Sequence, residues 1–165
     1  MSFYVGVATT PLGALTLNWV NNMLVAVSFG NTPPQNFLQK YWQHSVWQKN
    51  DKLAESTTKN WFNAAGKLDW ATAQTTPHQL YGTDFQTQVW QALINHAQQT
   101  SGQQTTSYGA LAKKINKPNA ARAVGGALNK NPLLLLMPCH LVVGHNGALT
   151  GFAAGLAVKK QLLGV

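Results

Sequence analysis

The sequence is poor in cysteine, and this shortage limits the chemistry that the chain can support. One cysteine, Cys139, occurs in 165 residues. This excludes an internal disulfide and a zinc site built from several cysteines, and the five histidines show no metal-ligand spacing. A single unpaired cysteine is typical of proteins in a reducing compartment. We therefore expect a cytoplasmic protein that uses no metal ion and no other cofactor.

The sequence also lacks a long apolar run. Its longest, from Pro132 to Val143, is interrupted by Cys139 and His140, whereas a membrane helix needs about 20 apolar residues. The charged and then apolar start of a signal peptide is not seen either. We expect no membrane segment, and the length allows one domain or two small ones.

Acidic residues are few and are confined to the first half of the chain. All of them precede residue 85: Asp51, Glu55, Asp69 and Asp84. Seven cations and no acid follow: Lys113, Lys114, Lys117, Arg122, Lys130, Lys159 and Lys160. The net charge of +8 therefore divides into +1 before residue 85 and +7 after it. A region that carries only positive side chains favours binding of a polyanion, and nucleic acid is the first candidate.

The first half of the chain is typical of a small antiparallel sheet followed by helices. Residues 3–29 hold alternating segments separated by turn signals, and residues 34–49 and 51–65 have the apolar spacing of helices. Four tryptophans recur at helical spacing and are expected in the core, with base stacking as the alternative: Trp42, Trp47, Trp61 and Trp70. We assign residues 1–76 to an N-terminal scaffold domain and place the linker at about 74–82.

The second domain, residues 83–165, is predicted to be mostly helical. Thr83 or Asp84 can cap a helix whose apolar stripe runs to Ala97. Two short helices, over 108–115 and from about 120 to 128, suggest a helix-turn-helix. A helical hairpin without a DNA function is the alternative, and the basic charge favours the DNA-binding interpretation. The expected fold class is α+β, with the sheet in the first domain and the helix-turn-helix and cysteine segment in the second.

The second of these short helices has an unusual composition. Only small residues surround Arg122, which is its one long polar side chain before Asn129. Small residues permit a helix to approach a nucleic-acid groove closely, at some cost in helix stability from the glycines. The alternative is that they only allow tight packing on a neighbouring element.

Cys139 stands between Pro138 and His140 at the end of the apolar run. A free cysteine is commonly a small buried hydrophobic residue, so inert filling is one interpretation. An adjacent imidazole, however, is a usual means of forming the reactive thiolate, and Pro138 restrains the backbone before the sulfur. These neighbours favour a nucleophile.

Several motifs in the second half occur in a specific order. They are Phe85-Gln86-X-X-Val89-Trp90, Thr106-Ser107-Tyr108-Gly109, Ala120-Ala121-Arg122-Ala123-Val124-Gly125, Asn131-Pro132, Pro138-Cys139-His140-X-Val142-Val143, Gly151-Phe152 and Gly155-Leu156-Ala157-Val158-Lys159. Together they closely resemble the O6-alkylguanine-DNA alkyltransferases, the methylated-DNA–protein-cysteine methyltransferases. The resemblance covers essentially all of residues 83–163 and is looser in the first half.

The resemblance implies DNA repair by direct, stoichiometric transfer. In that family the cysteine thiolate, here Cys139, takes the alkyl group from guanine O6, and each molecule acts once. The target base leaves the duplex to reach the sulfur. His140 is implied to act as the base through water, and Asn131 to shape the turn before the active-site strand. The implied partner is double-stranded DNA containing O6-alkylguanine, bound by a monomer, with clustering along DNA left open.

The resemblance also implies a set of DNA- and base-binding residues. Tyr108 would crowd the target phosphate and donate toward guanine N3, and Arg122 would fill the place of the flipped nucleotide. Ala121 and Gly125 belong to the helix that the family docks in the minor groove. The carbonyls of Cys139 and Val142 would receive the guanine amino group, and the backbone N–H near Ala153 would face O6.

Two positions depart from the family pattern. Leu141 stands where the family usually has arginine, and no acidic side chain follows the leucine pair Leu162-Leu163, where the family has a glutamate that orients the histidine. We expect the terminal carboxylate of Val165 to be able to substitute. Without such an acid the thiolate is less favoured, so we expect transfer to be retained but slower.

Two competing functions follow from the same residues. One is a protein that binds alkylated DNA without transferring the group, although proteins of that kind lack the cysteine found here. The other is a cysteine hydrolase with a Cys139–His140 dyad. Adjacent residues rarely face each other as nucleophile and direct base, and no third member of a triad is evident. Both are weaker than the transfer hypothesis.

Overall fold

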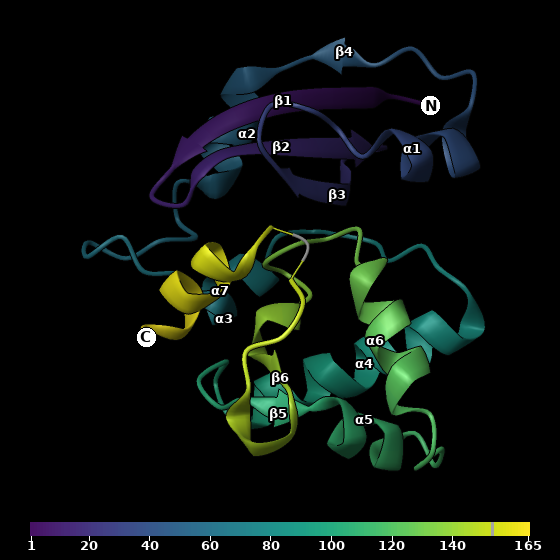
Figure 1. Cartoon of the computed structure of the whole chain (residues 1–165). Helices are drawn as coiled ribbons and strands as arrows, with labels where there is room; N and C mark the ends of the chain where they lie inside the picture. The colour runs from purple at the N-terminus through teal and green to yellow at the C-terminus, as the bar shows by residue number, and fades with distance from the viewer. Residues whose placement is uncertain (153) are drawn as a thin grey trace. The chain divides into compact units, whose positions relative to one another are not determined.

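The structure of the protein, a computed structural model, describes residues 1–152 and 154–165 (Figure 1). The chain divides into two units. The first comprises Met1–Tyr81 and Pro132–Leu136, and the second comprises Gly82–Asn131 and Met137–Val165. Helices and sheet occur together, which confirms the predicted α+β fold class. Among the described residues, no helix has the length and apolar character that crossing a membrane requires.

A four-stranded sheet organises the first unit. Strands β1 (Phe3–Thr10), β2 (Gly13–Val20) and β3 (Met23–Phe29) are antiparallel neighbours, and β4 (Gln48–Lys49) pairs in parallel with β1. The order across the sheet is β3-β2-β1-β4. The alternating pattern of residues 3–29 therefore predicted these strands correctly.

A short segment from late in the sequence is added to this sheet. Val27 donates its N–H to the carbonyl of Pro132 at 2.8 Å, and Leu134 donates to the carbonyl of Val27 at 3.3 Å. Leu135, which is buried, has a φ of +75°, a conformation that costs a bulky residue about 1–2 kcal/mol. The predicted boundaries keep residues 132–136 with the second domain, whereas the contacts assign them to the first unit.

Side chains of α3 (Trp70–Gln74) hold the end of the same segment. The indole N–H of Trp70 donates to the carbonyl of Leu136 at 2.9 Å, and the amide of Gln74 donates to the same carbonyl at 2.6 Å. Because the whole run from Leu133 to Met137 is buried, these polar contacts satisfy a carbonyl that has no access to water.

The other two helices of the first unit are shorter than the sequence pattern predicted. Helix α1 (Gln35–Trp42) ends well before Lys49, because the chain then extends to form β4, and α2 (Asp51–Thr58) ends before residue 65. Trp61 and Trp70 are buried as expected. Trp42 and Trp47 are not in the core but half-buried, and they stack edge to face with centroids 6.2 Å apart. Aromatic edges and faces attract each other, which explains this arrangement.

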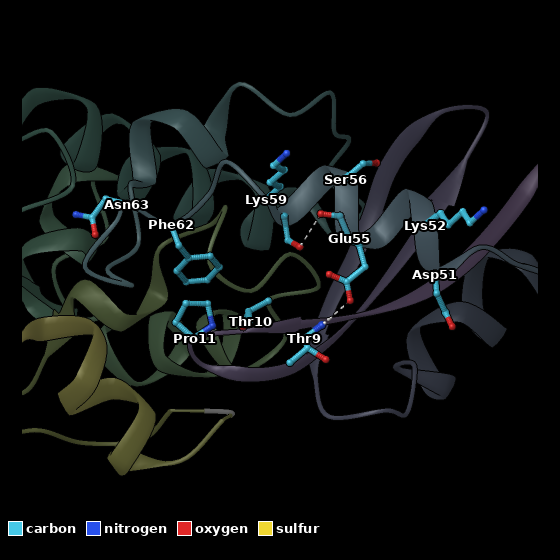
Figure 2. Close-up of a pocket in the computed structure, with 11 residues that line it drawn as sticks. Thr9, Thr10, Pro11, Asp51, Lys52, Glu55, Ser56, Lys59, Phe62 and Asn63 are labelled. Atoms are coloured by element: carbon cyan, nitrogen blue, oxygen red, sulfur yellow. Dashed lines mark hydrogen bonds between the residues drawn. The ribbon is translucent and has the colours of Figure 1, made fainter.

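Helix α2 covers the free edge of β1. The carboxylate of Asp51 accepts the N–H of Val7 at 3.0 Å, and that of Glu55 accepts the N–H of Thr9 at 3.0 Å. Asp51 and Glu55 are four residues apart and therefore lie on one face of the helix. Figure 2 shows Glu55 and Thr9 among the residues that line a cavity of about 690 Å³, which Phe62 and Pro11 also line. The two carboxylates therefore occupy N–H groups of β1 beyond the short stretch that β4 pairs, where an unpaired strand could otherwise bind another chain.

The second unit is built around α4 (Asp84–Gln99). Thr83 and Gln86 form the capping box at its start, and its apolar stripe is buried from Val89 to Ala97. Helices α5 (Tyr108–Lys114) and α6 (Ala121–Asn129) pack on it (Figure 1), and the indole N–H of Trp90 donates to the carbonyl of Ala127 at 2.9 Å.

Two short strands and a last helix complete the second unit. Strand β5 (Thr106–Ser107) pairs in parallel with β6 (Val142–Val143), and α7 (Leu156–Leu163) packs against the turn that precedes β6. The parallel pair places the start of α5 next to the strand that follows Cys139. The two short helices predicted from sequence are present, joined at Asn116, whose φ is +61°.

Gly6 permits the close approach of β1 and α2. A Cβ at this position would lie far inside van der Waals contact with the carbonyl of Asn50 and 3.0 Å from the Cβ of Ala54. We expect Gly6→Ala to destabilise the protein by about 1–3 kcal/mol in urea unfolding. Gly109→Ala is the control, because its Cβ would meet nothing within 4 Å and alanine favours a helix. Equal stability of the two variants would contradict this packing.

Candidate functional site

Cys139 begins a tight turn in the second unit. The 3₁₀ turn η1 (Cys139–Leu141) follows Pro138, whose φ is −83°, and runs directly into β6. The N–H of Cys139 donates to the carbonyl of Met137 at 2.8 Å, and that of Leu141 donates to Pro138 at 3.0 Å. The sulfur-bearing residue is 8% exposed, so the turn holds the thiol in a nearly dry environment.

Asn131 lies beside the sulfur. Its amide Nδ2 donates to Sγ of Cys139 at 3.2 Å and to the carbonyl of Met137 at 2.9 Å. Asn131 follows the end of α6, so one side chain joins the exit of that helix to the cysteine turn. An N–H directed at sulfur stabilises the thiolate more than the thiol, because the anion is the stronger acceptor. The structure thus brings together two residues that the sequence motifs singled out.

Burial controls the ionisation of Cys139. It raises the pKa of the thiol from 9.0 to about 11, while the hydrogen bond from Asn131 and the positive charge of Lys159 lower it by smaller amounts. Desolvation disfavours the charged form of any acid, and here it outweighs the two stabilising contacts. The resting sulfur is therefore a thiol at neutral pH.

His140 is also buried, with 3% of its surface exposed. Burial, and to a smaller extent the charge of Lys159, lower the pKa of its imidazole from 6.5 to about 4. The imidazole is therefore neutral at pH 7. Within the part of the chain that the structure describes, Nδ1 of His140 has no hydrogen-bond partner. The expectation that the carboxylate of Val165 would orient His140 is therefore wrong in this structure, and Val165 itself is 78% exposed.

Lys159 is a residue of this site that the sequence analysis did not single out. It lies in α7, is fully buried, and donates from Nζ to the carbonyl of Val142 and, at 2.8 Å, to that of Thr150. Burial lowers the pKa of its ammonium, and the charge of the Cys139 thiolate raises it. In the sequence, Lys159 is marked only as a cation and as the last residue of a motif, because a lysine within a helix pattern is normally solvated and its burial has no local signal.

Tyr108 stands at the start of α5, capped by Ser107, and its hydroxyl accepts a hydrogen bond from the Thr150 hydroxyl at 3.2 Å. With Cys139 it borders a cavity of about 10 Å³, which has room for about one water molecule. The other lining residues are Leu128, Asn129, Gly151 and Phe152. A purine does not fit into this cavity as it stands.

The remaining predicted residues lie on α6 and β6. Arg122 is exposed on α6, with Ala121 beside it, and neither borders the cavity. A Cβ on Gly125 would lie 3.7 Å from the Tyr108 ring, so this glycine faces the tyrosine. Val142 is buried, and its carbonyl accepts from Lys159. Ala153 lies outside the described residues.

Leu141, which stands where the family usually has arginine, is 2% exposed, so this position is filled by an apolar side chain packed in the interior.

Within residues 1–152 and 154–165, no three or more histidine, cysteine, aspartate or glutamate side chains are grouped so as to hold a metal ion.

The fold and the site define an α+β protein with a buried cysteine centre in its second unit. Residues 84–165 match the family described as the DNA-binding domain of 6-O-methylguanine DNA methyltransferase. Solved structures agree over the whole chain. That of Mycobacterium tuberculosis OGT in complex with DNA has a TM-score of 0.73 and 30% identity, and the alignment covers 98% of this chain and 91% of that one.

Curated relatives agree as well. Methylated-DNA–protein-cysteine methyltransferases of Methanosarcina barkeri and Haemophilus influenzae are 39% identical over 120 residues and 35% over 130, covering 71% and 76% of this chain and 70% and 68% of theirs. The chain therefore belongs to the methylated-DNA–protein-cysteine methyltransferase family, which confirms the resemblance seen in the motifs. It spans about half the length of other curated relatives, such as that of Methanosarcina acetivorans, 49% identical over 82 residues, 50% of each chain.

The pH dependence of Cys139 reactivity checks the electrostatics of the site. Because the thiol pKa is about 11 rather than 9.0, we expect carbamidomethylation by iodoacetamide at pH 8 to be about 100-fold slower than for an unstructured peptide with the same cysteine. Asn131→Ala removes a donor to the sulfur and should slow the reaction further. Intact-mass kinetics from pH 7 to 11 measure both. A rate that levels off below pH 9 would contradict the buried thiol.

Proposed function

We propose that this protein repairs DNA by transferring the alkyl group of O6-alkylguanine to its own Cys139. The observation that supports this most is a single buried cysteine whose sulfur receives the amide N–H of Asn131, within the region that matches the methyltransferase DNA-binding domain. Such a contact stabilises an anionic sulfur nucleophile, whereas a cysteine that only packs in the core does not need a hydrogen-bond donor. The names of the relatives point to the same reaction.

The proposed step is an in-line displacement at the alkyl carbon. The S–C bond forms as the C–O6 bond breaks, and the bonding electron pair stays on O6. The thiol proton is taken up by the guanine, so that neutral guanine and a neutral thioether result. Because the thioether is not hydrolysed, each molecule reacts once.

The proposed role of His140 is to accept the proton of the Cys139 thiol. A neutral imidazole is able to accept the thiol proton through one water molecule, and the cavity beside Cys139 has room for one. Since the pKa of His140 is about 4, the imidazolium does not persist at neutral pH. The proton therefore moves on to the departing guanine. We assign to Tyr108 a hydrogen bond toward guanine N3, and to Asn131 the support of the thiolate.

The proposed substrate is double-stranded DNA, with the alkylated base turned out of the helix. The cavity is too small for a purine, so binding the base requires Tyr108 and the Gly151–Phe152 region to separate. We propose that Arg122 fills the gap left in the stack and that Ala121 and Gly125 let α6 approach the minor groove. The Val142 carbonyl and the N–H near Ala153 would recognise the base. We propose further that the protein acts as a monomer in the cytoplasm.

Mass measurement tests the transfer directly. After incubation with an oligonucleotide duplex containing O6-methylguanine, the intact protein should gain one methyl group per molecule, and Cys139→Ala should gain none. Cys139→Ser serves as a control of similar volume for DNA binding. Binding without a gain in mass would favour a lesion-binding protein, and more than one equivalent of repaired base would contradict a single-use acceptor.

Arg122 separates binding of the duplex from chemistry at sulfur. We expect Arg122→Ala to slow repair of duplex DNA by at least about tenfold while leaving the reaction with free O6-benzylguanine within about twofold, because only the duplex needs a substitute for the flipped base. Single-turnover rates measure both. Lys160→Ala, which removes another exposed cation, on α7, is the matched control. Equal losses with both substrates would refute this role of Arg122.

A further inference from the structure

Lys159, in α7 of the second unit, lies in the protein interior, where lysines are rarely found. Lys159 has no exposed surface, and no other lysine or arginine among the described residues is buried. Lysine is almost never fully buried unless it is paired, because removing an ammonium from water is costly. The position of Lys159 therefore requires partners that offset this cost.

The hydrogen-bond partners of Lys159 are two backbone carbonyls from different segments. One belongs to Val142, at the start of the strand that directly follows the cysteine turn, and the other to Thr150. The same ammonium therefore fastens both segments to α7. Carbonyls are neutral acceptors, however, and two of them leave the charge itself without a counterion.

Among the residues of the second unit that the structure describes, Cys139 is the only buried group that can become an anion and supply that counterion. No carboxylate side chain follows Asp84 in the sequence, and Asp84 is exposed at the start of α4. The other titratable groups described around the sulfur are His140 in η1, whose imidazole is neutral or positive but not an anion, and Tyr108 in α5, whose hydroxyl is hydrogen-bonded to that of Thr150. Lys159 and the Cys139 thiolate, by contrast, stabilise each other through their opposite charges.

We propose that Lys159 is a positioning residue for the transfer, which fixes the backbone around Cys139 and supplies positive charge that stabilises the thiolate when the thiol loses its proton. This rests on the proposed function only in the identity of the acceptor, because the charge pairing itself needs no DNA. His140 does not fill this role: its imidazole is neutral, and the nearby ammonium opposes its protonation.

The proposal has a consequence for the reacted protein. Before transfer the sulfur is a neutral thiol that is able to become an anion, and after transfer it is a neutral thioether that is not. In the reacted protein Lys159 keeps its two carbonyls, but the sulfur can no longer act as its counterion. A buried charge without a counterion destabilises the folded state. A permanent anion attached at the same sulfur should therefore stabilise the fold more than a neutral group of the same shape.

Substitution of Lys159 tests the charge. We expect Lys159→Met, which keeps the length without the charge, to slow carbamidomethylation of Cys139 by at least about tenfold at pH 8 and to move the pH profile to higher pH. Lys159→Arg should recover part of the rate, and Lys160→Met controls for the removal of a nearby exposed cation. A purely structural role would lower the melting temperature of Lys159→Met but leave its pH profile unchanged, and that result would overturn the proposal.

The unmutated protein provides a second test in case Lys159→Met does not fold. Cys139 is modified with iodoacetamide or with iodoacetate, and intact mass confirms one adduct on each sample. The two adducts have nearly the same shape, but only the carboxymethyl group is an anion. We expect the carboxymethyl protein to melt at the higher temperature, and equal or reversed melting temperatures would refute the pairing.

Neither test uses DNA. A protein that fails to repair O6-methylguanine can still show the charge pairing, and a protein that repairs it can fail to show the pairing. Failure of the proposed function and failure of this inference are therefore distinguished.

Discussion

The site depends on how the chain is held from Asn131 to Cys139. The five residues between Asn131 and Met137 are bound to the sheet of the first unit through the backbone of Val27. Asn131 then closes the segment by donating both to the carbonyl of Met137 and to the sulfur. Because one amide donates to both, it fixes the position of the thiol relative to the backbone of Met137.

Burial determines the protonation states of Cys139 and His140. A thiol that is hidden from water is a weak acid, and a hidden imidazole is a weak base, so the resting site holds both in neutral form. A neutral thiol reacts more slowly with electrophiles than a thiolate does. Among the described residues, Lys159 is the one buried lysine or arginine, and no acidic side chain follows Asp84 in the sequence.

Local patterns predicted local structure well. The alternation in residues 3–29 predicted the antiparallel strands, and Thr83, one of the two predicted caps, is the N-cap of α4. The helix predicted to reach Lys49 failed, because β4 forms by pairing with β1, an interaction between distant residues. Trp42 showed the same limit: helical spacing shows that residues share a face, but not whether that face reaches the core.

The sequence by itself determined which residue could be the acceptor, since it holds one cysteine, and it determined the family through motifs that are local in the chain. It also determined the one-signed charge of the second half. Only the tertiary structure decided that residues 132–136 join the first sheet, that Asn131 touches the sulfur, and that Lys159 is buried beside it. These are contacts between segments whose approach depends on packing of the whole unit, and no pattern of neighbouring residues encodes them.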